Sequence, residues 1–146
     1  MSAAIDWDAL LAAALKVRQN AHAPYSDFQV GAAILTDDGR IFTGCNVEIS
    51  SFSHTCCAER VAVFKAVSEG ARRVLACAVV TDTSPPVSPC GACRQVLNDF
   101  GPDMTVLLSN PAGERRSYPL STLLPEAFLP DRVLEKIHAR YGKGTE

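Results

Sequence analysis

The chain has 146 residues, of which 47% are hydrophobic and 21% are charged, and its formal net charge is -2. These values are ordinary for a globular protein, so they exclude a disordered body, and the length predicts one domain spanning residues 1–146. The sequence lacks the basic stripe of a nucleic-acid-binding protein and any apolar run that could span a membrane.

Hydrophobic periodicity and turn residues predict helices and strands in alternation. In chain order we expect a helix at 6–20, a hairpin of strands 28–36 and 40–47 around Asp37-Asp38-Gly39, a loop at 48–56, a helix at 57–68 ended by Gly70, a buried central strand at 73–81, a helix at 90–100 closed by Gly101, strands at 104–109 and 115–118, and helices at 120–128 and 132–141. Five strands interleaved with helices predict an α/β sandwich with a mixed sheet.

The six cysteines are expected to be reduced. The N-terminal segment carries Asp6 and Asp8 and has no basic leader, so it does not read as a signal peptide, and we expect a cytoplasmic protein. Cys45 and Cys77 lie in apolar runs that are typical of small buried side chains.

Three other cysteines form a pattern that is typical of zinc ligands. Cys90 and Cys93 are three residues apart, which places both sulfurs on one face of the expected helix, and Cys57 begins another expected helix. A structural zinc site uses four protein ligands, whereas a catalytic site uses three and keeps a position for water. The count of three favours a catalytic site.

Charged residues beside these cysteines suit the same chemistry. Glu59 follows Cys57 by two residues, as the catalytic glutamate of zinc-dependent base deaminases follows the first metal ligand. That resemblance implies that Glu59 takes a proton from the attacking water, protonates the ring nitrogen of a base and later protonates the departing amine. Arg60 and Arg94 are candidates for hydrogen bonds that offset the charge of three thiolates. For Arg94, a solvated or capping role is an equal alternative.

The sequence resembles the small homotetrameric cytidine deaminases. The resemblance spans roughly residues 21–130 and rests on the segments Pro24 to Gly31 (PYSDFQVG), Asn46 to Glu48 (NVE), Cys57 to Arg60 (CAER), Pro89 to Gln95 (PCGACRQ) and Leu123 to Pro125 (LLP). It implies a three-layer α-β-α sandwich with a five-stranded mixed sheet. It also implies zinc-dependent deamination of cytidine and 2'-deoxycytidine to uridine and 2'-deoxyuridine in pyrimidine salvage.

The same resemblance implies roles for further residues. Phe28 and the backbone around Ala58 would contact the base, and Asn46 and Glu48 would bind the sugar 3'-hydroxyl of a free nucleoside. Phe128 would reach the active site of a neighbouring subunit, so the active sites of a homotetramer would be shared. Arg60 would hydrogen-bond the metal-binding sulfurs.

The sequence departs from the family pattern at Phe52, where tyrosine is common, and at His54, where an apolar residue is usual. These departures leave undefined which side chains would form one of the subunit contacts. One alternative is a structural zinc module in which His54 or Cys56 supplies a fourth ligand. A thiol-disulfide enzyme using Cys90 and Cys93 is less compatible with the pattern, and another amino-pyrimidine substrate is the alternative within the deaminases.

Overall fold

The computed structural model describes residues 4–142. In chain order its elements are α1 (Trp7–Arg18), β1 (Val30–Thr36), β2 (Ile41–Cys45), the 3-10 helix η1 (Phe52–His54), α2 (Ala58–Ser68), β3 (Val74–Thr81), α3 (Gly91–Phe100), β4 (Thr105–Ser109), β5 (Arg115–Pro119), α4 (Leu120–Leu123) and α5 (Pro130–Tyr141). Within residues 4–142, no helix is both apolar enough and long enough to cross a membrane.

The strands form one five-stranded sheet in the order β2-β1-β3-β4-β5. Only β3 and β4 run parallel among the described neighbours, with Val79 opposite Leu108, whereas the other neighbouring strands are antiparallel. The parallel pair needs a crossover, and α3 supplies it between β3 and β4. The prediction of a mixed five-stranded sheet is therefore confirmed.

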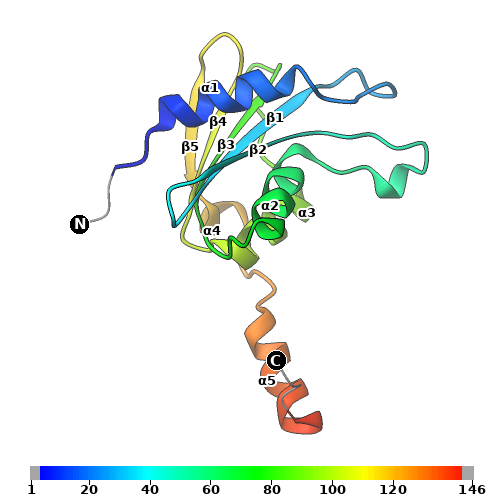
Figure 1. Ribbon diagram of the computed structural model, residues 1–146, viewed down its shortest axis with the longest axis vertical. Coiled ribbons are helices and arrows are strands. Elements are labelled where there is room, and N and C mark those ends of the chain that lie inside the picture. The colour runs from blue at the N-terminus through cyan, green and yellow to red at the C-terminus, as the bar shows by residue number, and fades with distance from the viewer. Residues whose placement is uncertain (1–3, 143–146) are drawn as a thin grey trace.

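Helices cover both faces of this sheet (Figure 1). Along β3, Ala76, Ala78 and Val80 pack with Leu10 and Ala14 of α1 on one face. Side chains of opposite orientation, including Cys77 and Val79, pack on the other face with residues of α2, α3 and α4, among them Val63, Leu97 and Leu120. Because successive strand residues point to opposite faces, this division explains why β3 is apolar throughout.

The predicted helix over residues 120–128 is wrong beyond Leu123. In the structure α4 ends there, and Leu124 leaves helical geometry with φ -138° and ψ 69°. The residue before a proline is disfavoured in the helical region, and Pro125 follows directly. Glu126 then takes a positive φ of 53°, so the chain turns before Phe128. The predicted loop at 48–56 also contains the short helix η1.

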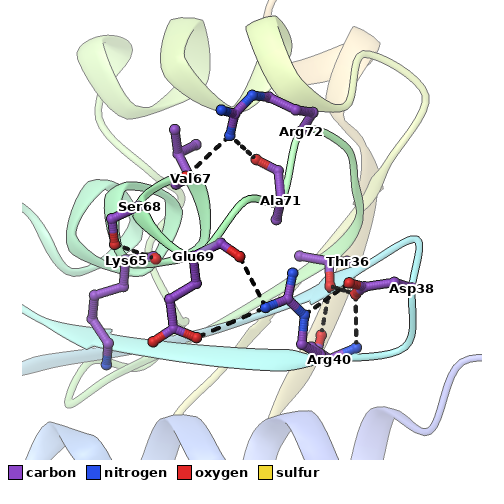
Figure 2. A network of polar contacts seen from close by, with 9 residues as sticks. All are labelled: Thr36, Asp38, Arg40, Lys65, Val67, Ser68, Glu69, Ala71 and Arg72. Atoms are coloured by element: carbon purple, nitrogen blue, oxygen red, sulfur yellow. Dashed lines mark hydrogen bonds and ion pairs between the residues drawn. The ribbon is translucent and has the colours of Figure 1, made fainter.

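A polar network joins the β1–β2 turn to the C-terminal end of α2 (Figure 2). The Arg40 side chain donates to Asp38 at 2.8 Å and to the main-chain carbonyl of Glu69 at 3.1 Å, while Asp38 accepts from Thr36 at 2.6 Å. The charged side chains of Arg40, Asp38 and Glu69 are exposed to solvent, so their ion pairs contribute modestly to stability. The network links the β1–β2 turn to Glu69, the C-cap residue of α2.

Candidate active site and metal centre

A cavity of about 350 Å³ lies where two loops meet the N-terminal ends of α2 and α3. The loops are joined by main-chain hydrogen bonds from His22 N to Asn46 O (2.9 Å) and from Glu48 N to His22 O (2.8 Å). The lining includes two of the predicted metal ligands, Cys57 and Cys90. It also includes five other residues predicted for the site, which are Phe28, Asn46, Glu48, Ala58 and Glu59.

The three predicted metal ligands come together at this cavity. The sulfurs of Cys57, Cys90 and Cys93 all lie within 4.8 Å of one another, and those of Cys57 and Cys90 are 3.7 Å apart. Two sulfurs bound at about 2.3 Å to a tetrahedral zinc would be separated by about 3.8 Å. The spacing and the thiol donors therefore fit zinc, and these three cysteines are positioned to bind it.

The local fold places two of these thiols at helix ends. Cys57 is the N-cap residue of α2 and Cys90 is the N-cap residue of α3, and both have extended backbone geometry. The positive end of a helix dipole favours a thiolate. The contact with the Cys93 thiol, followed by that with Arg60, holds the pKa of the Cys57 thiol below its usual range against the opposing effect of burial, and the pKa of Cys93 is raised.

Arg60 lies one helical turn from the sulfur that it contacts. Its Nη2 donates to Cys57 Sγ at 3.4 Å and to the carbonyl of Thr55 at 3.5 Å. The hydrogen bond to Cys57 holds the pKa of this guanidinium above its usual range, so it stays charged. A fixed positive charge beside three thiolates reduces the net negative charge around the metal position.

Glu59 is buried, with 4% of its surface exposed, and faces the sulfur cluster. The Cys93 thiol donates to Glu59 Oε2 over 3.7 Å. Burial raises the pKa of this carboxyl to about 7, which allows it to accept and to release a proton near neutral pH. Such a group is suited to general acid and base catalysis on a molecule in the cavity.

Asn46 and Glu48 also line the cavity, and both are held by hydrogen bonds. Asn46 accepts from Val30 N at 2.8 Å and donates to Phe28 O at 2.7 Å. The Glu48 carboxylate accepts from Ser26 Oγ at 2.5 Å, and its pKa is lowered mainly by this bond. The two side chains are therefore oriented before any ligand binds.

Phe128 is not brought to this cavity by the chain's own fold. Its side chain is 64% exposed, and it is absent from the cavity lining. Its main-chain carbonyl accepts from Gln95 Nε2 at 3.0 Å, which anchors the segment to α3. The exposed ring is available to another molecule.

Two residues have structural roles that the sequence left open or missed. Arg94 donates to Pro89 O (2.7 Å), Ser88 Oγ (2.6 Å) and Leu123 O (2.7 Å), so it caps the loop before Cys90. Ser26 also donates its main-chain N–H to Glu48 at 3.1 Å. No local sequence signal links Ser26 to a carboxylate 22 residues away.

The alternative of a closed structural site lacks its fourth ligand among residues 4–142. Neither His54 nor Cys56 belongs to the sulfur cluster. His54 Nδ1 instead hydrogen-bonds to Ser51 Oγ at 2.9 Å, and the main chain of Cys56 pairs with Val47. The thiol pair Cys90 and Cys93 is likewise part of a three-sulfur cluster, which a disulfide exchange enzyme does not require.

Comparisons with known proteins agree with this geometry. The family model "Cytidine and deoxycytidylate deaminase zinc-binding region" matches residues 6–109. A cytidine deaminase of Sporosarcina psychrophila is 52% identical over 85% of this chain and 92% of its own length. A cytidine deaminase of Halalkalibacterium halodurans is 50% identical over 85% of this chain and 95% of its own length. The crystal structure of cytidine deaminase from Burkholderia pseudomallei superposes with a TM-score of 0.82 at 47% identity, covering 85% of this chain and 100% of that one. The chain belongs to the cytidine and deoxycytidylate deaminase zinc-binding family.

Proposed function

We propose that this protein hydrolyses cytidine and 2'-deoxycytidine to uridine and 2'-deoxyuridine, with release of ammonia, in pyrimidine salvage. The observation that carries the proposal is the buried carboxyl of Glu59 beside three clustered thiols at one nucleoside-sized cavity. Relatives at about half identity are named cytidine deaminases, which supports the choice of substrate.

The metal centre would be held by Cys57, Cys90 and Cys93. Zinc, when bound there, supplies a Lewis acid that makes water a better nucleophile near neutral pH. Three thiolates leave this site more negative than a site of neutral ligands, which weakens that acidity. Arg60 counters the effect by donating to the Cys57 sulfur.

Glu59 would move the protons of the reaction. As a carboxylate it removes one proton from water while the water oxygen bonds to carbon 4 of the cytosine ring, and it passes that proton to ring nitrogen 3. A second proton from the former water then reaches the amino group through Glu59. The carbon–nitrogen bond breaks, ammonia leaves, and carbon 4 becomes the carbonyl of uracil.

The other cavity residues would select the substrate. Asn46 and Glu48 offer an amide and a carboxylate, which together suit a ribose hydroxyl that donates and accepts hydrogen bonds. Phe28, which is 37% exposed, offers a ring at the cavity wall for the base, and the main chain at Ala58 lies beside Cys57 to contact the cytosine edge. The net charge of -2 favours a free nucleoside over a nucleic acid.

The assembly would be a homotetramer in the cytoplasm. Phe128 is exposed and lies outside the cavity of its own chain, so it would enter the site of a neighbouring subunit. Phe52 is 70% exposed and packs edge-on against Tyr25, with ring centroids 5.1 Å apart, which makes it a candidate for the same subunit contact. A shared site of this kind predicts that an isolated subunit is inactive.

The test compares variants of two glutamates, Glu59 within α2 and Glu69 at the cap of its C-terminal end. Glu59→Gln should retain one zinc per chain by metal analysis and lose about 10²- to 10⁴-fold in the rate at which cytosine absorbance decays. Glu69→Gln, at the exposed end of α2, should remain fully active. A chelator should abolish turnover of the wild-type protein, and turnover by Glu59→Gln at the wild-type rate would remove Glu59 from this role.

A further inference from the structure

Both oxygens of the Glu48 carboxylate are bound by one turn of the chain, residues 23–28. Oε1 accepts two successive main-chain N–H groups, from Tyr25 N at 2.9 Å and from Ser26 N at 3.1 Å. Oε2 accepts the Ser26 hydroxyl at 2.5 Å. Successive main-chain N–H groups can form a concave site for an anion. The turn and the carboxylate therefore form one polar unit, and Ser26 and Glu48 both line the cavity.

The turn is held in shape by hydrogen bonds of its own. Asp27 N donates to Ala23 O at 3.0 Å, and Asp27 has a φ of 55°, in the left-handed region that aspartate adopts more readily than most residues. Phe28 N donates to Ser26 Oγ at 3.1 Å. The Ser26 hydroxyl thus accepts from Phe28 and donates to Glu48. Because a hydroxyl has a single proton, Ser26 is committed to the carboxylate as a donor.

The Ser26 hydroxyl has an effect that the two N–H groups cannot supply. Both N–H groups bind the same oxygen, so by themselves they leave the carboxylate free to pivot about Oε1. The bond to Oε2 removes this freedom because it holds the second oxygen. The same bond is the largest cause of the lowered pKa of Glu48, so the side chain stays ionised and acts only as an acceptor.

The hydrogen bonds of residues 4–142 leave few positions for a ligand on this pair of side chains. A carboxylate has about four acceptor positions, two on each oxygen. Glu48 uses both positions of Oε1 and one of Oε2, so the open position is on Oε2, beside the Ser26 hydroxyl. The amide of Asn46 accepts from Val30 N and donates one of its two N–H groups to Phe28 O. Its other N–H remains to donate.

We infer that Ser26 is a positioning residue for the sugar: through Glu48 it fixes the acceptor position that takes the proton of the nucleoside 3'-hydroxyl. This role rests on the proposed function and narrows its substrate class. A hydroxyl fits because it can donate to Glu48 Oε2 and accept from the free N–H of Asn46 at the same time. A 3'-phosphate offers only acceptors and a negative charge, which the ionised carboxylate repels. The site therefore excludes a cytosine nucleotide that is joined to a chain through its 3' oxygen.

Two substrates that differ in one hydroxyl test the role of Ser26. 2'-Deoxycytidine carries the 3'-hydroxyl, and 2',3'-dideoxycytidine lacks it. Ser26→Ala should lower the ratio of kcat/KM for the first substrate to kcat/KM for the second about five- to tenfold. The change should come from a higher KM for 2'-deoxycytidine with little change in kcat, because the lost contact is made equally in the ground and transition states. Ser26 is exposed, so its truncation leaves no buried gap.

Two further variants separate positioning from a general effect on the fold. Ser26→Thr keeps the hydroxyl and should restore the wild-type ratio. Ser68→Ala is the matched control and should also show that ratio, because the exposed Ser68 hydroxyl donates to Lys65 O at 2.7 Å at the far end of α2. An equal loss of kcat/KM for both substrates in Ser26→Ala would overturn the role of Ser26 alone. Failure of the wild-type protein to deaminate either substrate would instead refute the proposed function, and this role with it.

Discussion

Gly44 of β2 is the position where one added methyl group should disturb the active site from a distance. A Cβ atom there would lie 2.3 Å from the carbonyl oxygen of Ala58 and 2.5 Å from the N atom of Ala62, and both atoms belong to the main chain of α2. Ordinary contact begins near 3.4 Å, so α2 would have to retreat by about 1.1 Å, which is 3.4 minus 2.3. That movement displaces Glu59, which follows Ala58.

We therefore expect Gly44→Ala to reduce both stability and turnover. Overpacking of this kind costs about 1–3 kcal/mol, which lowers the Tm of a protein this size by roughly 2–12 °C. A catalytic group moved by about 1 Å can cost about 10²-fold in rate. The assays are thermal unfolding and the initial rate of cytosine absorbance decay, measured on protein with its zinc content determined.

Gly91 provides the matched control. It begins α3 directly after the predicted ligand Cys90, and a Cβ atom there would meet no other atom within 4 Å. Because alanine is the better helix former, Gly91→Ala should leave turnover unchanged and keep or slightly raise the Tm. The reasoning is refuted if Gly44→Ala and Gly91→Ala have the same Tm and the same rate.

Three further outcomes are expected. Cys57→Ser should lose bound zinc and turnover, whereas Cys56→Ser, one residue away, should keep both when metal content and rate are measured. Arg94→Ala should lower stability by about 1.5–3 kcal/mol in urea unfolding, because three carbonyl or hydroxyl partners lose a charged donor. Glu48→Gln should raise KM for cytidine more than it lowers kcat, since the proposed contact is to the sugar; an unchanged KM would exclude that contact.

The positions of the helices and strands were largely predictable because their signals are local. Apolar spacing and glycine stops identified α1, α2 and α3, and the Asp37-Asp38-Gly39 turn identified the hairpin of β1 and β2. The helix predicted over residues 120–128 is wrong beyond Leu123, because Pro125 disfavours helical geometry at Leu124. Pro125 is itself a local signal, but the prediction gave more weight to the apolar residues of the segment. The single domain and the tetramer remain predictions.

In the candidate site, too, local spacing predicted some residue roles and could not predict others. The spacing of Cys57, Glu59, Cys90 and Cys93 already indicated a three-thiolate metal centre with an adjacent carboxyl, because residues two or three positions apart near the start of a helix have a fixed relation. The roles of Arg94 and Ser26 could not be obtained in this way. Their partners lie up to 29 residues away and come together only through packing.

The sequence alone determined the kind of chemistry, because it specifies which atoms can bind a metal and which group can carry a proton. The tertiary structure decided whether those atoms meet, by bringing Cys57 within 4.8 Å of two sulfurs that lie more than 30 residues along the chain. It also decided the acidity of Glu59, whose pKa of about 7 results from burial. Loss of water around a carboxyl depends on every segment packed against it, and no spacing within one segment specifies that.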